Sequence, residues 1–339
     1  MKQVKHKNDR EQMKLLETLL ILLENGFSMQ ESLAVMKRNH QISAPLLKLF
    51  GQSLQKGQTI AESFCQIGFS AQEKAQLQLA ELHGDLVVTL KTILQNRKIL
   101  RKQKEELQKV GAYPLLLMVF TLALLWGMKL YLLPSLLDSG MVDESHWSIV
   151  FLDYGPILLV GFLLGSVILL ETAGLYLKRQ SVIRKACFIS KLPVVGHLYK
   201  IYQTSNFALE WGKSYQQGLE TYQILTQMAR LKTTSLLTAV ANELHETLLS
   251  GDNLTKQLEQ YPFLLPEFSL IIFQGEIKGK LGDELLLYSQ LLTERMVTKV
   301  EQLIQWLQPV IFLFVAVLIV AIYVAMFLPM YGNLGGMIE

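Results

Sequence analysis

The sequence predicts an all-α membrane protein with two repeated cytoplasmic helical-bundle domains and three transmembrane helices. Three observations support this fold class. Half of the 339 residues are hydrophobic and only 18% are charged, which is typical of chains with membrane spans. Three apolar stretches are long enough to cross a bilayer, and the first part of the sequence recurs in the last part. The small formal net charge of +3 gives no reason to expect a nucleic-acid partner.

The first cytoplasmic domain is expected over residues 11–110, and it opens with an amphipathic helix. The apolar face of this helix is formed by Leu15, Leu19, Leu22 and Leu23. A signal peptide is the alternative, because basic residues precede the apolar run. Glu17 and Glu24 interrupt and close that run, and no small-residue cleavage site follows, so the sequence favours the helix.

Glycines and a capping box divide the rest of this domain into short helices. Breaks are expected at Gly26, at Gly57 and near Gly68. Ser28 and Glu31 have the spacing of a capping box, in which each side chain accepts a hydrogen bond from a free backbone N–H. A last long helix is expected to run from about Ala71 into the first span.

Three segments are predicted to cross the membrane, because each offers about 20 mostly apolar residues. They are residues 111–134, 156–177 and 307–331. Pro114 and Pro309 lead the first and third spans. Residues 135–155 form a short extracytoplasmic loop between the first two spans, and residues 332–339 form an extracytoplasmic tail.

Basic residues flank the spans asymmetrically. Between Lys91 and Lys109 there are seven Lys or Arg residues, whereas Ser135–Val150 contains none. Five more follow the second span: Lys178, Arg179, Arg184, Lys185 and Lys191. The positive-inside rule places the N-terminus in the cytoplasm and the C-terminus outside the cell membrane. The run at 91–109 is interpreted as a topology and anionic-lipid signal, with docking to an acidic partner as the alternative.

The repeat emerges when the first part of the chain is moved forward by 195 residues. Glu81 then meets Glu276, Gly84 meets Gly279, Pro114 meets Pro309 and Pro134 meets Pro329. Slightly smaller offsets pair Gly57 with Gly251 and Gly26 with Gly218. A second cytoplasmic domain that repeats the first is therefore expected over residues 178–306. The second span has no counterpart, and it returns the chain to the cytoplasm.

The candidate site residues are the repeated Glu81 and Gly84 and their counterparts Glu276 and Gly279. Each glycine is predicted to end a helix and turn the chain before the next one, since a left-handed backbone suits glycine. The glutamates have two interpretations that the sequence leaves open: a cap or turn within the fold, or a docking contact for a partner. A metal site that combines Glu81 and Asp85 with a distant carboxylate also stays open.

No catalytic or cofactor-binding motif is recognised. Gly275–Lys280 lacks the glycine spacing and the following Ser or Thr of a phosphate-binding loop. The six histidines fit no metal spacing. The two cysteines, Cys65 and Cys187, lie far apart, as in chains of a reducing compartment. The chain is therefore predicted not to be an enzyme and to need no cofactor.

Two helical domains, each with a Glu-x-x-Gly-x-Leu element before a proline-led span, resemble the platform proteins of type II secretion, type IV pilus and competence pseudopilus machines. The elements are Glu81–Leu86 and Glu276–Leu281, and the similarity covers nearly the whole chain. The short region before the first domain resembles the competence members of Gram-positive bacteria.

The resemblance implies a scaffold that couples a cytoplasmic assembly ATPase to insertion of a major pseudopilin, in support of DNA uptake during transformation. It also implies contact with membrane lipids, a homo-oligomer and no direct contact with nucleic acid. A platform of a type IV pilus or of a protein secretion system is the alternative within the family. A membrane transporter component is the alternative of another class, which the uncharged spans disfavour.

Overall fold

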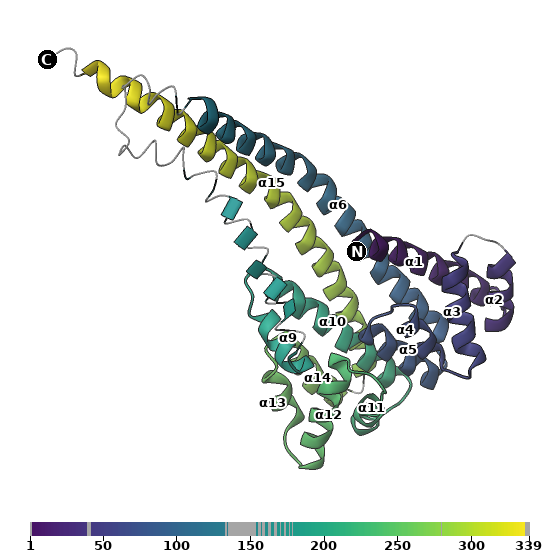
Figure 1. The fold of residues 1–339 in the computed structure, drawn as a ribbon. Helices are drawn as coiled ribbons and strands as arrows, with labels where there is room; N and C mark the ends of the chain where they lie inside the picture. Colours follow the sequence, from purple (N-terminus) through teal and green to yellow (C-terminus); the bar gives the residue numbers. More distant parts are fainter. Residues whose placement is uncertain are drawn as a thin grey trace. The chain divides into compact units, whose positions relative to one another are not determined.

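The computed structural model describes residues 2–38, 42–132, 134, 179–278 and 280–335, with single residues or pairs between 154 and 177. These residues are almost all helical and include no β-strand, so the predicted all-α class is confirmed (Figure 1). The chain divides into two compact units. Unit 1 consists of Met1–Lys102 and Gln180–Lys299, and unit 2 of Gln103–Arg179 and Val300–Glu339.

The first lobe of unit 1, residues 2–102, contains five helices and the start of a sixth. They are α1 (Lys2–Glu24), α2 (Met29–Arg38), α3 (Ala44–Gln55), α4 (Ile60–Gln66), α5 (Ala71–His83) and α6 (Leu86–Gly127). The predicted capping box is present, since Glu31 accepts from the backbone N–H of Ser28 and the Ser28 hydroxyl accepts from that of Glu31. The helix expected from Ala71 into the first span is two helices, because Gly84 separates α5 from α6.

The second lobe of unit 1, residues 180–299, contains six helices and the start of a seventh. The leading helix is α9 (Val182–Ser190). It is followed by α10 (Val195–Gln216), α11 (Thr221–Ala229), α12 (Leu236–Leu249), α13 (Leu254–Glu259), α14 (Pro266–Lys278) and the start of α15 (Leu281–Gly335). Gly26 and Gly57 adopt positive φ after the first and third helices of the first lobe, as Gly218 and Gly251 do in the second.

The first lobe has its own apolar core. Leucines of α1 pack against Phe50 of α3 and Phe64 of α4, which are all fully buried. The ring of Phe64 lies between those of Phe50 and Phe69, at centroid distances of 4.8 and 4.7 Å. Leu77 is the residue of α5 that enters this core.

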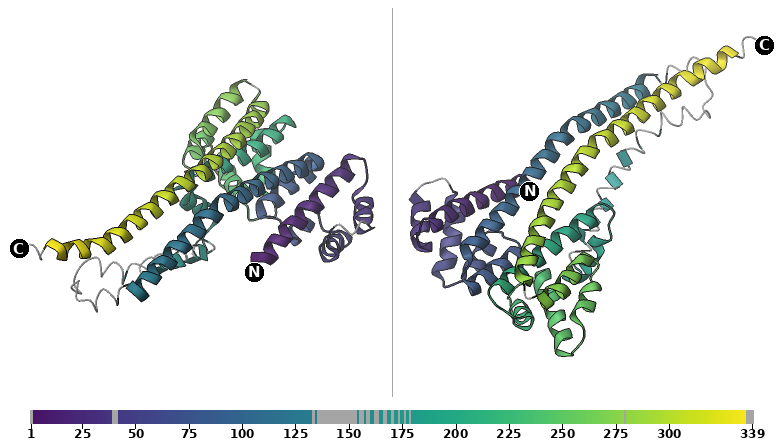
Figure 2. Two further views of the ribbon diagram at one scale, coloured as in Figure 1. Left: turned by 90° about the horizontal axis from the view of Figure 1, so that it is seen from above. Right: turned by 180° about the vertical axis from the view of Figure 1, so that it is seen from behind.

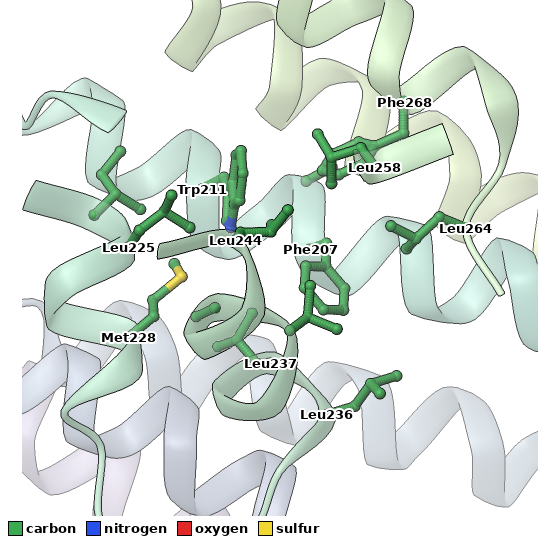
Figure 3. Close-up of a cluster of buried hydrophobic side chains, with 14 of the residues drawn as sticks. Phe207, Trp211, Leu225, Met228, Leu236, Leu237, Leu244, Leu258, Leu264 and Phe268 are labelled. Atoms are coloured by element: carbon green, nitrogen blue, oxygen red, sulfur yellow. The ribbon is translucent and has the colours of Figure 1, made fainter. Parts of the chain in front are cut away.

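The second lobe is built around Trp211, Phe207 and Phe268 (Figure 3). Ala75 and Leu79, on α5 of the first lobe, are buried in this same core. Leu77 therefore lies on the side of α5 that faces the first lobe, and Ala75 and Leu79 lie on the side that faces the second. Helix α5 packs against α4 of its own lobe and against α12 of the second lobe. Helix α5 therefore contributes side chains to the cores of both lobes.

Unit 2 contains the apolar parts of α6 and α15, together with a π-helical stretch at Met128–Leu132. Both helices continue through their internal prolines, Pro114 and Pro309. Figure 2 shows the ribbon from two further sides. Within this unit the ring of Tyr113 meets that of Phe312 edge-on at 5.7 Å. Most other large apolar side chains are exposed, including Leu115 and Leu313 at 69% and 68%.

Two described helices are long and apolar enough to cross a membrane, over Leu86–Tyr131 and Leu281–Ala321. These ranges include residues 111–131 of the first predicted span and residues 307–321 of the third. Each span is the continuation of a helix that begins in unit 1, rather than a separate element that starts at its proline. Of the second predicted span at 156–177 the structure describes only single residues and pairs, and of the loop at 135–155 it describes only Tyr154.

Candidate functional site: the Glu-x-x-Gly element

The Glu81–Leu86 element forms the tight turn between α5 and α6. Gly84 ends α5 in a left-handed conformation with φ of 77°, and its N–H donates to the carbonyl of Ala80 at 2.8 Å. A Cβ built on Gly84 would meet nothing within 4 Å. The backbone conformation, not crowding, is therefore what favours glycine here, as the sequence predicted.

The Glu81 side chain turns back into its own lobe. Its Oε1 accepts a hydrogen bond of 2.5 Å from the backbone N–H of Ile60, the first residue of α4. Burial raises the pKa of Glu81, and hydrogen bonds from the backbone N–H groups of Ile60 and Ala61 act in the opposite direction. This geometry is that of a cap between two helices, which was one of the two roles left open by the sequence.

The next residues of the element face the second lobe. His83 Nε2 lies 2.9 Å from Gln227 Oε1 on α11. Asp85 Oδ2 lies 4.0 Å from the ammonium group of Lys213 on α10, and this ammonium donates to Thr89 Oγ1 at 3.0 Å. The element thus holds its own α4 through Glu81 and the other lobe through His83 and Asp85. No sequence signal identified these cross-lobe partners.

A buried carboxylate lies under the same interface. Glu210, on α10, is only 3% exposed, and Gln76 Nε2 of α5 donates to its Oε1 at 3.1 Å. Burial raises the pKa of Glu210, and the nearby Lys213 cation opposes this rise. A small cavity beside the pair is lined by Gln72, Gln76, Gln203, Asn206, Phe207, Glu210 and Leu237. The lobe interface is therefore polar at its centre.

The counterpart element in the second lobe is only partly described. Glu276 lies on α14, but its side chain and the whole of Gly279 lie outside the described residues. In the first lobe, Glu81 and Asp85 point to different partners. Among the described residues, no group of three or more His, Cys, Asp or Glu side chains is placed to hold a metal ion.

In the first half of the basic run at 91–109, basic side chains pair with acidic side chains of the first lobe. Arg97 is 12% exposed and pairs with Glu73, with its Nε 2.6 Å from Oε1. Lys98 pairs with Glu17 at 2.5 Å, and Lys91 with Glu24 at 3.7 Å. The lipid interpretation therefore does not hold for Arg97, because its guanidinium anchors α6 inside the first lobe.

We expect Glu81→Gln to cost about 1 kcal/mol of stability, as loss of a cap does. The amide keeps the size of the side chain but offers one acceptor oxygen in place of two to the backbone N–H groups of Ile60 and Ala61. Thermal labelling of Cys65, the partly buried thiol of α4, measures this loss in the full chain. Recovery of partner proteins on the purified variant should stay at the wild-type level. A normal labelling temperature together with lost partners would instead assign Glu81 to docking.

We expect Glu210→Gln to raise the unfolding temperature at neutral pH. A carboxyl with a folded pKa above its ordinary value of 4.5 destabilises the fold when it is charged. This penalty is absent below about pH 4.5 and grows as pH rises through the folded pKa. The advantage of the variant should therefore shrink as the pH falls toward 4.5. Glu259→Gln, at an exposed position, is the control. A Glu210→Gln variant that is less stable than the wild type at neutral pH would contradict the prediction.

Comparison with known proteins adds a family to this geometry. The family model of type II secretion system (T2SS) protein F matches residues 15–134 and again residues 207–329, which together are well over half of the chain. ComG operon protein 2 of Bacillus subtilis is 27% identical over 302 residues, covering 84% of this chain and 90% of that protein. The Type 4 fimbrial assembly protein PilC of Pseudomonas putida is 25% identical over 349 residues, covering 94% and 82%. The Protein transport protein HofC homolog of Haemophilus influenzae is 25% identical over 347 residues, covering 96% and 85%.

Proposed function

This chain belongs to the type II secretion system protein F family, and we propose on that basis that it is the membrane platform of a competence pseudopilus machine. In this role it couples a cytoplasmic assembly ATPase to the insertion of the major pseudopilin, and so supports DNA uptake. The chain acts as a scaffold and contributes no catalysis of its own. Its similarity to ComG operon protein 2 favours the competence machine. A type IV pilus or protein secretion platform is the alternative, given its similarity to PilC and HofC.

The shared helix α5 is the observation that carries a scaffold role. Leu77 packs into the core of the first lobe, while Ala75 and Leu79 pack into the core of the second. Because well-packed interiors transmit displacements rather than absorb them, a force on one lobe moves the other. Each lobe also continues into an apolar helix, α6 or α15. Such a connection suits a protein that passes motion from a cytoplasmic motor to subunits in the membrane.

We further propose that the lobes are two copies of one domain. Corresponding helices have similar lengths, such as 10 and 9 residues for α2 and α11, and 13 residues each for α5 and α14. In each lobe a polar side chain of the long helix bonds to the backbone just before the fifth helix of the proposed repeat: Gln12 of α1 donates to the carbonyl of Ile67, and Thr204 of α10 accepts from the N–H of Leu265. Both contacts hold the loop that leads into the fifth helix. The twofold match of the family model supports the same proposal.

The proposed topology has three spans, with both lobes in the cytoplasm. It predicts on which side of the membrane each reporter fusion lies. Fusions at Ser190 and Gln260 should report the cytoplasm, and fusions at Asp143 and Glu339 the outside. An outside location of Gln260 would refute the three-span topology.

A pull-down from detergent tests the function itself. The tagged full chain should recover an assembly ATPase and a pseudopilin, and its deletion should abolish both the fibre and uptake of labelled DNA. Leu79→Asp, which places a charge of α5 in the core of the second lobe, should lose the fibre. Leu82→Asp, on the same helix but 63% exposed, is the matched control and should keep it. Recovery of a pilin with normal DNA uptake in the deletion strain would favour the pilus alternative, and recovery of neither partner would favour a transporter.

A further inference from the structure

The corner between α9 and α10 presents basic and apolar side chains side by side. Val182, Ile183 and Cys187 of α9 pack against the core of the second lobe. From the exposed side chains of the remaining face of α9 and the following turn we define the α9 corner patch: Arg184, Lys185, Phe188, Lys191, Val194 and Val195. Phe188 is 49% exposed, although it is among the largest apolar side chains.

The turn in this patch is strained. Val194 has φ of 64° and ψ of −62°, and the N–H of Val195 donates to the carbonyl of Pro193 at 2.7 Å. This γ-turn is unfavourable for a β-branched residue and easy for glycine. Its closure is tight, because a Cβ on Gly196 would lie 2.4 Å from the carbonyl oxygen of Ser190. The strained corner holds Val194 and Val195 outward, at 60% and 54% exposure.

The charges of the patch are of one sign. The ion pairs found in the described part of the chain involve none of Arg184, Lys185 or Lys191. Besides burial, the charge of nearby Glu243 raises the pKa of Cys187 on α9. The Glu243 carboxylate accepts a hydrogen bond from the hydroxyl of Tyr261 in the second lobe. A basic surface with an aromatic and two aliphatic side chains at its tip matches the interface of an anionic bilayer.

We propose that the α9 corner patch binds the cytoplasmic leaflet, with Phe188, Val194 and Val195 among anionic lipid headgroups. The inference rests on the proposed second span, which ends at residue 177, five positions before α9 begins. Five residues reach at most about 18 Å, so the start of α9, with Arg184 and Lys185 in its first turn, lies within reach of the leaflet. The second lobe is thereby held at the membrane by its surface as well as by its covalent connection to the spans.

Spin labels in the full chain test this directly. A nitroxide is placed at Val195→Cys, in a Cys65→Ser, Cys187→Ala background, and the chain is reconstituted in vesicles of phosphatidylcholine with phosphatidylglycerol. The label at 195 should be accessible to oxygen and protected from a water-soluble nickel complex. A label at Leu249→Cys, on a side chain that is 64% exposed at the end of α12, should be open to the nickel complex. A second label at Val194→Cys guards against a local folding defect at 195.

Two variants separate charge from apolar insertion. Lys185→Gln with Lys191→Gln should lower the ratio of inserted to free label by about 30-fold, because each cation near an anionic surface favours binding about 5-fold. Val194→Gly relieves the turn and removes the side chain, so it should reduce protection without loss of folded protein. Lys232→Gln with Lys256→Gln, on other elements, is the matched control.

Two results would overturn the proposal. One is equal nickel accessibility at 195 and 249 in the anionic vesicles. The other is protection that persists in pure phosphatidylcholine and grows with protein density, which would assign the patch to a protein contact. A failure of the topology is a separate result, because the reporter at Ser190 would then lie outside, whereas an unbound patch leaves that reporter in the cytoplasm.

Discussion

Arg97→Met is expected to destabilise the first lobe by about 3–5 kcal/mol, as removal of one partner from a buried ion pair does. The guanidinium makes a two-pronged contact with Glu73, at 2.6 and 2.9 Å. It also donates to Gln12 Oε1 at 2.8 Å and lies 4.0 Å from the centre of the Phe69 ring. Methionine keeps much of the apolar part of the arginine side chain, so the measured loss of stability comes mainly from removal of the charge. The Glu73 side chain, which is only 17% exposed, would lose its cation partner.

Cys65 labelling during heating measures this loss in the full chain, and Lys98→Met is the matched control. Lys98 follows Arg97 on α6 and also pairs with an acid of α1, Glu17, but both side chains are about half exposed, at 51% and 48%. Exposed pairs of this kind contribute less than about 1 kcal/mol. Similar losses for Arg97→Met and Lys98→Met would show that the buried network does not stabilise the lobe.

The same network gives the wild-type chain an acid-sensitive contribution to stability. Burial tends to raise the pKa of Glu73, but the hydrogen bonds and charge of Arg97 and the hydrogen bonds from Ser70 together lower it. A depressed folded pKa adds stability above the ordinary value of 4.5, and this stability is lost as the pH falls through the folded pKa. Arg97→Met should therefore lose less stability than the wild type below about pH 4.5.

Gly282→Ala is expected to destabilise the second lobe by roughly 1–3 kcal/mol, the usual cost of overpacking. Gly282 lies where α15 crosses α10, opposite Gly212. A Cβ on Gly282 would lie 2.9 Å from the backbone nitrogen of Gln216 and 3.2 Å from the carbonyl oxygen of Gly212. These atoms belong to the α10 backbone, so the helices must separate to admit a methyl group.

The thiol of Cys187, on α9 against the second core, reports unfolding of this lobe, and Gly111→Ala is the control. Gly111 is also helical, but a Cβ there would meet nothing within 4 Å. Alanine at 111 should be neutral or favourable by up to about 1 kcal/mol through helix propensity. An unchanged labelling temperature at Cys187 in Gly282→Ala would show that α10 and α15 can separate freely at this crossing.

The two largest expected effects lie on the two helices that continue toward the membrane. Arg97 fixes the start of α6 in the first lobe, and Gly282 fixes the start of α15 in the second. If the chain transmits motion as proposed, both variants should weaken fibre assembly more than their loss of folded protein explains. Glu81→Gln, which loosens only the α4 cap, should not.

Much of the local structure follows from the sequence alone. The helical class, the breaks at Gly26, Gly57 and Gly68 and the capping box at Ser28 were all predicted. Each depends on residues within one or two helical turns, where apolar spacing, side-chain caps and the backbone freedom of glycine act without the rest of the chain. The two apolar helices can also be predicted from the sequence, because a membrane span is recognised by its length and composition. The repeat of Glu81 and Gly84 was visible for the same reason, as a pattern of identities.

The tertiary structure decided which partners those residues meet. Sequence spacing did not indicate that Glu81 caps α4, that Asp85 faces Lys213, or that Arg97 turns away from solvent to Glu73. Nor did it show that opposite sides of α5 belong to the cores of different lobes, or that Gly282 marks a helix crossing. These contacts join residues far apart in the chain, and they form only when helix faces pack. The sign and strength of each charge's contribution then depend on the burial that this packing creates.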